Sequence, residues 1–317
     1  MLNRRQFLQS TAALAATSFL PDITFADSLA LKKIGVQLFS VPKLLDKDFA
    51  GTLKMLAQMG YKEVELYGPF PFSTQSAHDR WNAVTPSLGF KGSGYFGHTA
   101  KEIKQILADN GLTSPSIHTD LDTLKNRMGE LGEAGHLLGH KYVGLPAIPD
   151  ELRKNLDAYK RIADDFNKIG EAAKKVGLRF AYHNHGYGLV EMEGKVPVEL
   201  LLERTDPQLV FMEMDLYWTT AGGVDPMTYL TKYANRYKLL HIKDMAKKVR
   251  FPGDGGDASQ WIGLFQYMTD AGSGVLDLKS IMTKAQAIGV EHFIVEQDMV
   301  ATPETSLKKS FDFLSKL

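Results

Sequence analysis

The sequence predicts an α/β fold, a single-domain (β/α)8 barrel, on three observations. Strand-like runs alternate with segments of helical spacing eight times along the chain. Several expected helices end in a glycine before the next strand, as at Gly60, Gly111, Gly177 and Gly289, and helix C-caps occur at such positions. The length of 317 residues lies within the range that single barrels reach.

The expected strands follow one another at intervals that leave room for one helix each. They cover residues 33–39, 61–67, 113–118, 141–145, 178–183, 208–215, 237–242 and 291–297. The expected helices cover residues 49–59, 101–110, 123–138, 151–176, 196–203, 226–234, 278–288 and 304–314. An open, doubly wound sheet is the alternative, but no G-x-G-x-x-G motif follows the first strand, which favours the barrel.

The connections after the second and seventh strands are too long for plain βα loops. Residues 68–99 carry many aromatic side chains, and residues 245–277 contain two glycine-rich stretches. In a barrel both connections would lie over the C-terminal mouth, where active sites are built. Two interpretations stay open for each: a lid or sugar-stacking wall that excludes water, or an insertion or dimer contact without a role in catalysis.

Residues 1–26 are expected to be a twin-arginine signal peptide and not part of the fold. Arg4 and Arg5 precede an apolar, alanine-rich stretch over residues 11–20, and cleavage is expected after Ala26. The barrel domain would then cover residues 27–317 and be exported to the periplasm. No apolar run reaches the length of about 18 residues that a membrane-spanning helix needs, so no span is expected in the mature form.

Composition excludes several classes of site. The 37 basic and 37 acidic residues give zero net charge, so no nucleic-acid partner is expected. Cysteine is absent, which excludes disulfides and thiolate metal ligands. A metal would have to be bound by His, Asp and Glu, and such donors suit Mn, Mg, Co or Zn. The sequence leaves the oligomeric state open, including a homo-oligomer.

Polar residues spaced i, i+2 end the last four expected strands. The pairs are His183/His185, Glu213/Asp215, His241/Lys243 and Glu296/Asp298. Both members of a pair lie on one face of a strand, and the C-terminal ends of barrel strands converge on one pocket. One residue from each pair, His183, Asp215, His241 and Glu296, therefore predicts a site for one divalent metal ion. The alternative is that each residue only closes its own strand end.

Five short stretches are typical of one enzyme family. They are IGVQL (residues 34–38), AYHNHG (181–186), EMDLYW with GVDP (213–218 and 223–226), LHIKD (240–244) and VEQD (295–298). Through them the chain resembles the sugar phosphate isomerase/epimerase family, the xylose isomerase-like TIM barrels. In that family Glu, Asp, His and Glu from strands 5 to 8 hold one divalent metal. The resemblance implies the same role for His183, Asp215, His241 and Glu296.

The chain departs from the family at the first of these ligands. Epimerases have a glutamate at the end of strand 5, which also moves a proton opposite the glutamate of strand 8, whereas this chain has His183. Related sequences with a His-Asn-His motif continue to a glutamate where this chain has Gly188. The missing carboxylate counts against a simple two-base C3-epimerisation.

The other polar residues at the mouth have expected roles. Glu296 is expected to be the catalytic base, with His185 or Lys243 handling the opposite proton. The alternatives are a structural histidine and a salt bridge from Lys243 to Asp298. Glu213 is expected to orient a ligand histidine from behind, or to be a hidden second base. The residues expected to contact the substrate are Gln37, Glu65, His118, Trp218 and Asp298.

Three functions fit this site. The first is a divalent-metal-dependent isomerase or epimerase that acts on a sugar or keto-sugar derivative by α-proton abstraction. The second is a dehydratase or lyase on a keto-sugar or keto-glycoside, which would use the same residues and needs only one base. The third is a non-catalytic sugar-binding barrel. A small-molecule sugar is the expected partner in each case.

Overall fold

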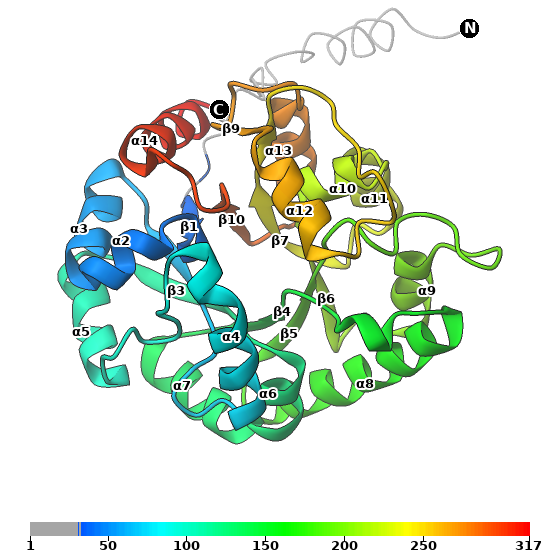
Figure 1. Ribbon diagram of the computed structural model, residues 1–317, viewed down its shortest axis with the longest axis horizontal. Helices are drawn as coiled ribbons and strands as arrows, with labels where there is room; N and C mark the ends of the chain where they lie inside the picture. The colour runs from blue at the N-terminus through cyan, green and yellow to red at the C-terminus, as the bar shows by residue number, and fades with distance from the viewer. Residues whose placement is uncertain (1–30, 32) are drawn as a thin grey trace, which may run out of the picture.

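The computed structural model describes residue 31 and residues 33–317, and the expected signal peptide, residues 1–26, lies outside the described residues. Eight parallel strands form a closed barrel in the order β1-β10-β7-β6-β5-β4-β3-β2 (Figure 1). They are β1 (Gly35–Gln37), β2 (Glu63–Tyr67), β3 (Thr113–His118), β4 (Tyr142–Leu145), β5 (Arg179–His183), β6 (Val210–Asp215), β7 (Tyr237–Ile242) and β10 (His292–Val295). Each lies within an expected strand segment, so the predicted barrel is confirmed.

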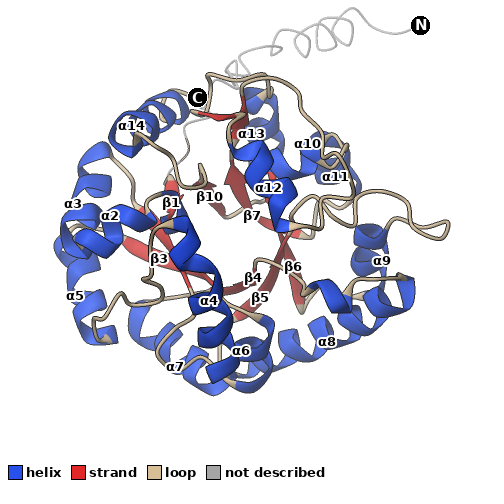
Figure 2. Ribbon diagram, in the orientation of Figure 1, coloured by secondary structure: helices blue, strands red, loops and turns tan. Residues whose placement is uncertain are grey.

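A ring of helices covers the outside of the barrel (Figure 2). It comprises α3 (Phe49–Met59), α5 (Ala100–Asp109), α6 (Leu121–Asn126), α7 (Met128–Leu138), α8 (Leu156–Lys175), α9 (Pro197–Arg204), α11 (Pro226–Lys232), α13 (Leu278–Ala287) and α14 (Pro303–Leu314). The expected helix over residues 123–138 is divided into α6 and α7 because Arg127 leaves the helical conformation, at φ −130° and ψ 29°. No helix in the described part of the chain has the length and apolarity needed to cross a membrane.

Both long connections contain a helix that the sequence did not predict. The connection after β2 includes α4 (Gln75–Leu88), and the connection after β7 includes α12 (Ala258–Phe265). The side chains of Thr74 and Asp257 accept hydrogen bonds from backbone amides in the first turns of α4 and α12 and so cap them. Both helices lie over the C-terminal end of the barrel (Figure 1). The expectation that these connections cover the mouth is confirmed.

Shorter elements complete the fold. They are the 3-10 turns η1 (Leu38–Ser40) and η2 (Asp150–Leu152), the helices α2 (Pro42–Lys47) and α10 (Leu216–Ala221), and a hairpin of β8 (Asp244–Met245) and β9 (Met268–Thr269). Asp244 supports the segment that follows β9, since its carboxylate accepts hydrogen bonds from the amides of Gly272, Gly274 and Leu276. The hairpin and this carboxylate anchor the chain that leaves and re-enters the mouth around α12.

A small apolar layer fills the barrel interior below the polar strand ends. Ala181, Leu239 and Ile294 are buried there in one cluster with Tyr142. The first three stand two residues before His183, His241 and Glu296, respectively. Because residues i and i+2 share a face, this layer directly underlies the polar one. The polar side chains therefore rest on a layer of buried apolar residues.

His140 is a buried histidine in the turn before β4, away from the mouth. Its Nδ1 lies 2.5 Å from the carbonyl oxygen of Ser114 in β3. Burial lowers the pKa of His140 from 6.5 to about 4, because the charged ring would lose its hydration. The unfolded chain therefore binds a proton near pH 6.5 that the folded chain does not accept until about pH 4.

We expect this histidine to make the fold less stable in weak acid. Its contribution is fully present above about pH 6.5 and is lost towards about pH 4, and the loss reaches about 3 kcal/mol in the free energy of unfolding. Urea unfolding of the wild type and of His140→Gln at several pH values measures it, and the variant should lose less stability in acid. His136→Gln, at an exposed position in the same region, is the control. If the free energy of unfolding fell equally with pH in the wild type and in His140→Gln, the explanation would be contradicted.

Candidate active site

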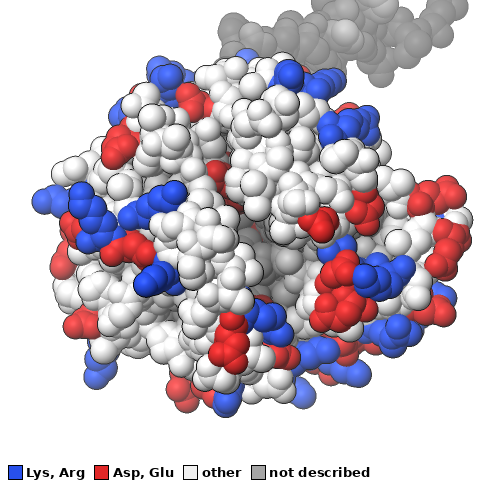
Figure 3. Space-filling model, in the orientation of Figure 1, with Lys and Arg blue, Asp and Glu red and all other residues white. Residues whose placement is uncertain are grey.

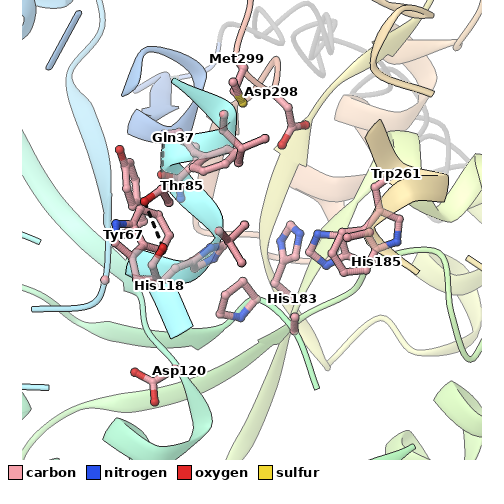
Figure 4. A pocket seen from close by; sticks show the side chains of 18 of the residues that line it. Gln37, Tyr67, Thr85, His118, Asp120, His183, His185, Trp261, Asp298 and Met299 are labelled. Carbon is pink, nitrogen blue, oxygen red and sulfur yellow. Dashed lines mark hydrogen bonds between the residues drawn. The ribbon is translucent and has the colours of Figure 1, made fainter. Parts of the chain in front are cut away.

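The C-terminal ends of the strands form the floor of a cavity of about 470 Å³, which opens between α4 and α12. Figure 3 shows a hollow at the centre of this face of the molecule. Figure 4 shows how His118, His183, His185 and Asp298 lie around the cavity. A cavity of this size at the C-terminal mouth of a barrel is where a binding site is expected.

Strand register decides which of the polar strand ends meet. His183 of β5 lies in register with Glu213 of β6, and Asp215 lies in register with His241 of β7. His183 is therefore level with Glu213 and not with Asp215. The strand ends rise around the barrel in steps, because closing a barrel requires the strands to be staggered. Two neighbouring groups of donor atoms result.

The first group consists of Asp215, His241 and Glu296, whose donor atoms lie within 4.8 Å of one another. All three side chains are buried, and His241 Nδ1 lies 2.7 Å from Glu296 Oε2. The structure thus brings together three of the four expected metal ligands. The fourth, His183, stands outside this group, with its Nε2 3.9 Å from Asp215 Oδ2.

The second group consists of His118, His183, Glu213 and His241, also within 4.8 Å of one another. Glu213 Oε2 lies 2.6 Å from His118 Nε2 and 3.2 Å from His183 Nδ1. Gly144 leaves the room that His118 needs, because a Cβ there would lie 2.7 Å from the His118 ring. Glu213 Oε1 also lies 3.3 Å from His241 Nε2, so Glu213 contacts three imidazoles at once, which suits a residue that orients ligand histidines.

Lys243 places its ammonium group among three carboxylates. Its Nζ lies 2.9 Å from Asp215 Oδ2, 2.7 Å from Glu296 Oε2 and 2.6 Å from Asp298 Oδ2. The lysine is buried, and the ring of Trp218 lies 5.2 Å from the same nitrogen. The ion pair to Asp298, which the sequence left as one of two interpretations, is present, and Lys243 also spans the floor to Asp215.

Negative charge exceeds positive charge in this buried region. The buried carboxylates are those of Glu65, Glu213, Asp215 and Glu296, and the partly buried Asp298 lies beside them. Among the described residues, Lys243 is the one lysine or arginine that forms an ion pair with any of them. Buried charges need compensation, and a divalent cation held by carboxylates and imidazoles supplies it. The residues present therefore fit a divalent metal ion.

Burial and mutual charge move the pKa values of these groups in opposite directions. Burial disfavours a charged His241, but nearby glutamates, Glu213 first, outweigh it and hold the pKa of His241 well above its usual value. Burial also opposes ionisation of Glu296, but Lys243 and then His241 hold its pKa well below the usual value. Burial raises the pKa of Asp298 to about 7 in spite of Lys243. Glu296 is thus a carboxylate throughout the neutral range.

His185 lies at the side of the floor, stacked on Trp261 of α12 with ring centroids 4.3 Å apart. Burial, reinforced by the positive charge of Lys243, holds the pKa of His185 well below its usual value. Burial likewise lowers the pKa of His183 to about 3. Both rings are therefore neutral imidazoles, the form that ligates metals or hydrogen-bonds a substrate hydroxyl.

Four of the five residues expected to contact substrate line the cavity, namely Gln37, His118, Trp218 and Asp298. Glu65 is fully buried and is not among the lining residues; its Oε2 accepts a hydrogen bond from Gln37 Nε2 and lies 2.7 Å from His241 Nε2. The expectation that Glu65 contacts sugar hydroxyls is not met, because Glu65 stands two residues before the end of β2, one layer deeper. Tyr67, at the end of β2, lines the cavity instead.

The cavity walls come from residues that the sequence did not single out as site residues. α4 contributes Trp81 and Val84, and α12 contributes Trp261 and Ile262. The aromatic content of the connection after β2 was the only available signal. No feature of the sequence pointed to Arg153. In the structure its guanidinium lies 4.2 Å from the centre of the Tyr187 ring and donates hydrogen bonds to the carbonyls of Ile148 and Gly256. It thereby ties the segment before α12 to the barrel.

Comparisons with known proteins agree with the barrel fold. A family model described as xylose isomerase-like TIM barrel matches residues 53–317. An inosose dehydratase of Clostridium tetani is 31% identical over 134 residues, which are 42% of this chain and 44% of that protein. An inosose dehydratase of Lacticaseibacillus casei is 29% identical over 168 residues, 50% of this chain and 55% of that protein. The chain thus spans about half the length of these curated relatives.

A solved structure of similar shape covers most of the chain. The crystal structure of a sugar phosphate isomerase/epimerase from Parabacteroides distasonis ATCC 8503 is 25% identical, with a TM-score of 0.69, and covers 90% of this chain and 99% of that one. The crystal structure of the IolI protein with a bound zinc atom has a TM-score of 0.63 at 13% identity and covers 90% of this chain and 95% of that one. The second likeness concerns the fold alone.

We expect a bound divalent metal to depend on the first donor group. Asp215→Asn and Glu296→Gln should each reduce the metal content of purified protein to about a tenth or less, since each removes a charged ligand. Elemental analysis after dialysis measures it. His118→Asn, which alters only the second group, should retain the metal. Glu63→Gln is a matched control, because Glu63 is also a buried carboxylate paired with a histidine, His292. Loss of metal in His118→Asn but not in Glu296→Gln would assign the ion to the second group.

Proposed function

The chain belongs to the xylose isomerase-like TIM barrel family, and from that premise we propose that it is a divalent-metal-dependent lyase acting on a keto-sugar derivative. The reaction removes the proton on the carbon next to the carbonyl and then expels the substituent on the following carbon, as a dehydratase does. One observation carries the proposal: the cavity floor holds a carboxylate, Glu296, 2.7 Å from the ammonium of Lys243, while β5 ends in His183, where a two-base epimerase needs a second carboxylate.

Glu296 is the base in this reaction. It lines the cavity, and Lys243 and His241 keep it ionised at neutral pH, so it can accept a proton from a carbon above the floor. Asp215, His241 and Glu296, with His183 beside them, would hold the metal ion, which when bound supplies a Lewis acid that polarises a carbonyl and acidifies the neighbouring C–H bond. Asp298 and Gln37 line the same floor and can bind sugar hydroxyls.

Lys243 stabilises the negative charge that develops on the substrate oxygen when the proton leaves. Its ammonium lines the cavity and is positioned by ion pairs with Asp215, Glu296 and Asp298. When one of these contacts is exchanged for the substrate oxygen, an N–H group of Lys243 stabilises the developing charge at short range. The electron pair of the broken C–H bond forms the new double bond as the β-substituent departs. The proton on Glu296 can then pass to the departing oxygen. One carboxylate therefore serves both halves of an elimination.

Isomerisation or epimerisation is the second candidate. It begins with the same proton abstraction but returns a proton to carbon, so it needs an acid on the correct face of the substrate. The likeness to the Parabacteroides distasonis sugar phosphate isomerase/epimerase over 90% of the chain favours it. The relatives named inosose dehydratase, at up to 31% identity, favour elimination instead. A protein that binds sugar without turnover is the remaining alternative.

We expect elimination when purified protein is incubated in D₂O with keto-sugars, keto-glycosides and an inosose, each with Mn²⁺, Mg²⁺, Co²⁺ or Zn²⁺. The product should be an unsaturated ketone, detected by ultraviolet absorbance and by the mass of the lost group. Glu296→Gln should lower kcat by about 10²–10⁴-fold because the base is lost. Glu63→Gln, with its changed carboxylate outside the cavity lining, should keep most of the activity.

Solvent deuterium in a rearranged sugar, with no unsaturated product, would instead identify an isomerase. Thermal stabilisation by the sugars without any product would indicate a binding protein. Full activity of chelator-treated Glu296→Gln protein would rule out the mechanism altogether.

A further inference from the structure

The cavity extends well beyond its polar floor. Its outer half is walled by α4 and α12, which face each other across the opening. The apolar residues of these walls, called the apolar cleft from here on, are Trp81, Val84, Leu88, Trp261, Ile262 and Phe265. The floor offers charged and hydrogen-bonding groups, whereas the apolar cleft offers almost none. The two halves of one cavity therefore suit two chemically different parts of a ligand.

The apolar cleft exposes side chains that ordinarily avoid water. Val84 is 56% exposed and Ile262 is 51% exposed, which places both among the most exposed large hydrophobic residues of the described chain. Both line the cavity, one from each wall. Figure 3 shows mostly uncharged surface around the hollow. Contiguous apolar surface that borders a pocket usually marks a place where a ligand removes it from water.

The charged residues near the apolar cleft are paired with each other. Arg80 and Asp120 line the cavity on the α4 side, with 3.8 Å between Arg80 Nη2 and Asp120 Oδ1. Arg80 also contacts Asp122, at 3.4 Å. A phosphate in the cleft would meet an arginine already shared by two carboxylates. The charges at this end of the cavity are thus already compensated, which favours an uncharged part of a ligand here.

An aromatic wall joins the apolar cleft to the floor. Trp261 forms part of the cleft and stacks on His185, and the His185 ring lies 6.0 Å from Trp218 in a stacked arrangement. Trp218 in turn lies over Lys243. These stacked side chains form one side of the cavity, and such an aromatic wall favours a flat ring packed against it. A cavity of about 470 Å³ also exceeds the space that one sugar ring occupies and lies in the range of sites for larger ligands.

We propose that the substrate carries an uncharged aromatic substituent, which lies in the apolar cleft while its sugar ring occupies the floor. The substrate class is thus an aryl glycoside whose sugar already carries the keto group when it binds. This inference rests on the proposed function for the position of the sugar ring. The aromatic preference itself concerns binding and can be measured without turnover.

Binding of two probes to the full chain tests it. 4-Nitrophenyl β-D-glucopyranoside and methyl β-D-glucopyranoside share the sugar and differ in the substituent. We expect the aryl probe to bind at least about tenfold more tightly by calorimetry, because burying its ring removes apolar surface from water. Val84→Gln and Ile262→Gln together should bring the two affinities within about twofold of each other. Both positions are exposed, so the fold tolerates the change.

The matched control uses exposed valines outside the cavity lining. Val190 is 56% exposed and Val275 is 46% exposed, and neither lines the cavity. Val190→Gln with Val275→Gln should keep the full preference for the aryl probe. Equal affinities of the wild type for the two probes, or no measurable binding of either, would overturn the inference. A preference that survives Val84→Gln with Ile262→Gln would overturn it as well.

Two further measurements separate this inference from a dimer interface at the cleft and from the proposed lyase function. The oligomeric state of the wild type and the double variant, by light scattering, shows whether the cleft joins two copies. A dimer that dissociates in the double variant with an unchanged probe ratio would overturn the inference. Glu296→Gln should lose turnover yet keep the aryl preference. Failure of the proposed function therefore appears as an absent product with the preference intact, whereas failure of this inference appears in the probe ratio alone.

Discussion

The ammonium of Lys243 is the group on which the site depends. Lys243 directly follows β7, and its ammonium lies within 2.9 Å of three carboxylates. Asp215 comes from the end of β6, and Glu296 and Asp298 come from the segment after β10. Unpaired charges in a buried position would cost several kcal/mol each, so this ion-pair network constrains three neighbouring chain segments together. The same network keeps Glu296 ionised and leaves a net negative charge that suits a divalent cation. The structural support of the barrel mouth and its chemistry therefore rest on the same contacts.

The stagger of the strands divides the polar residues into two groups that share His241. Asp215 and Glu296 lie on one side of it, and Glu213, His118 and His183 lie on the other. His241 contacts Glu296 through Nδ1 and Glu65 through Nε2, so carboxylates hold its ring at both nitrogens. A histidine held in this way is oriented before any ligand arrives, which is the preorganisation that electrostatic catalysis needs.

The cavity combines a charged floor with apolar walls. The floor is built on strands, which a packed apolar layer supports from below, whereas the walls are helices inserted in long connections. Arg153 and the carboxylate of Asp244 hold the second insertion in place through backbone contacts. The strands thus position the polar groups of the floor, while the inserted helices form the walls, which in the proposed function would select what else the substrate carries. This division explains how a shared barrel can serve different substrates.

The sequence by itself determined the eight strands, most of the helices and the polar pairs at the mouth, because strand and helix periodicities and i, i+2 facing are local properties. It also identified Asp215, His241 and Glu296 as neighbours, since the ends of consecutive parallel strands must converge. Only the tertiary structure placed His183 beside Glu213 and put Glu65 beneath the floor, because register and depth depend on the closure of the whole barrel. The same holds for α4 and α12. Pro86 and a polar composition hide the helical pattern of α4, and the glycines before α12 resemble an open loop, so the walls of the cavity became visible only in the folded chain.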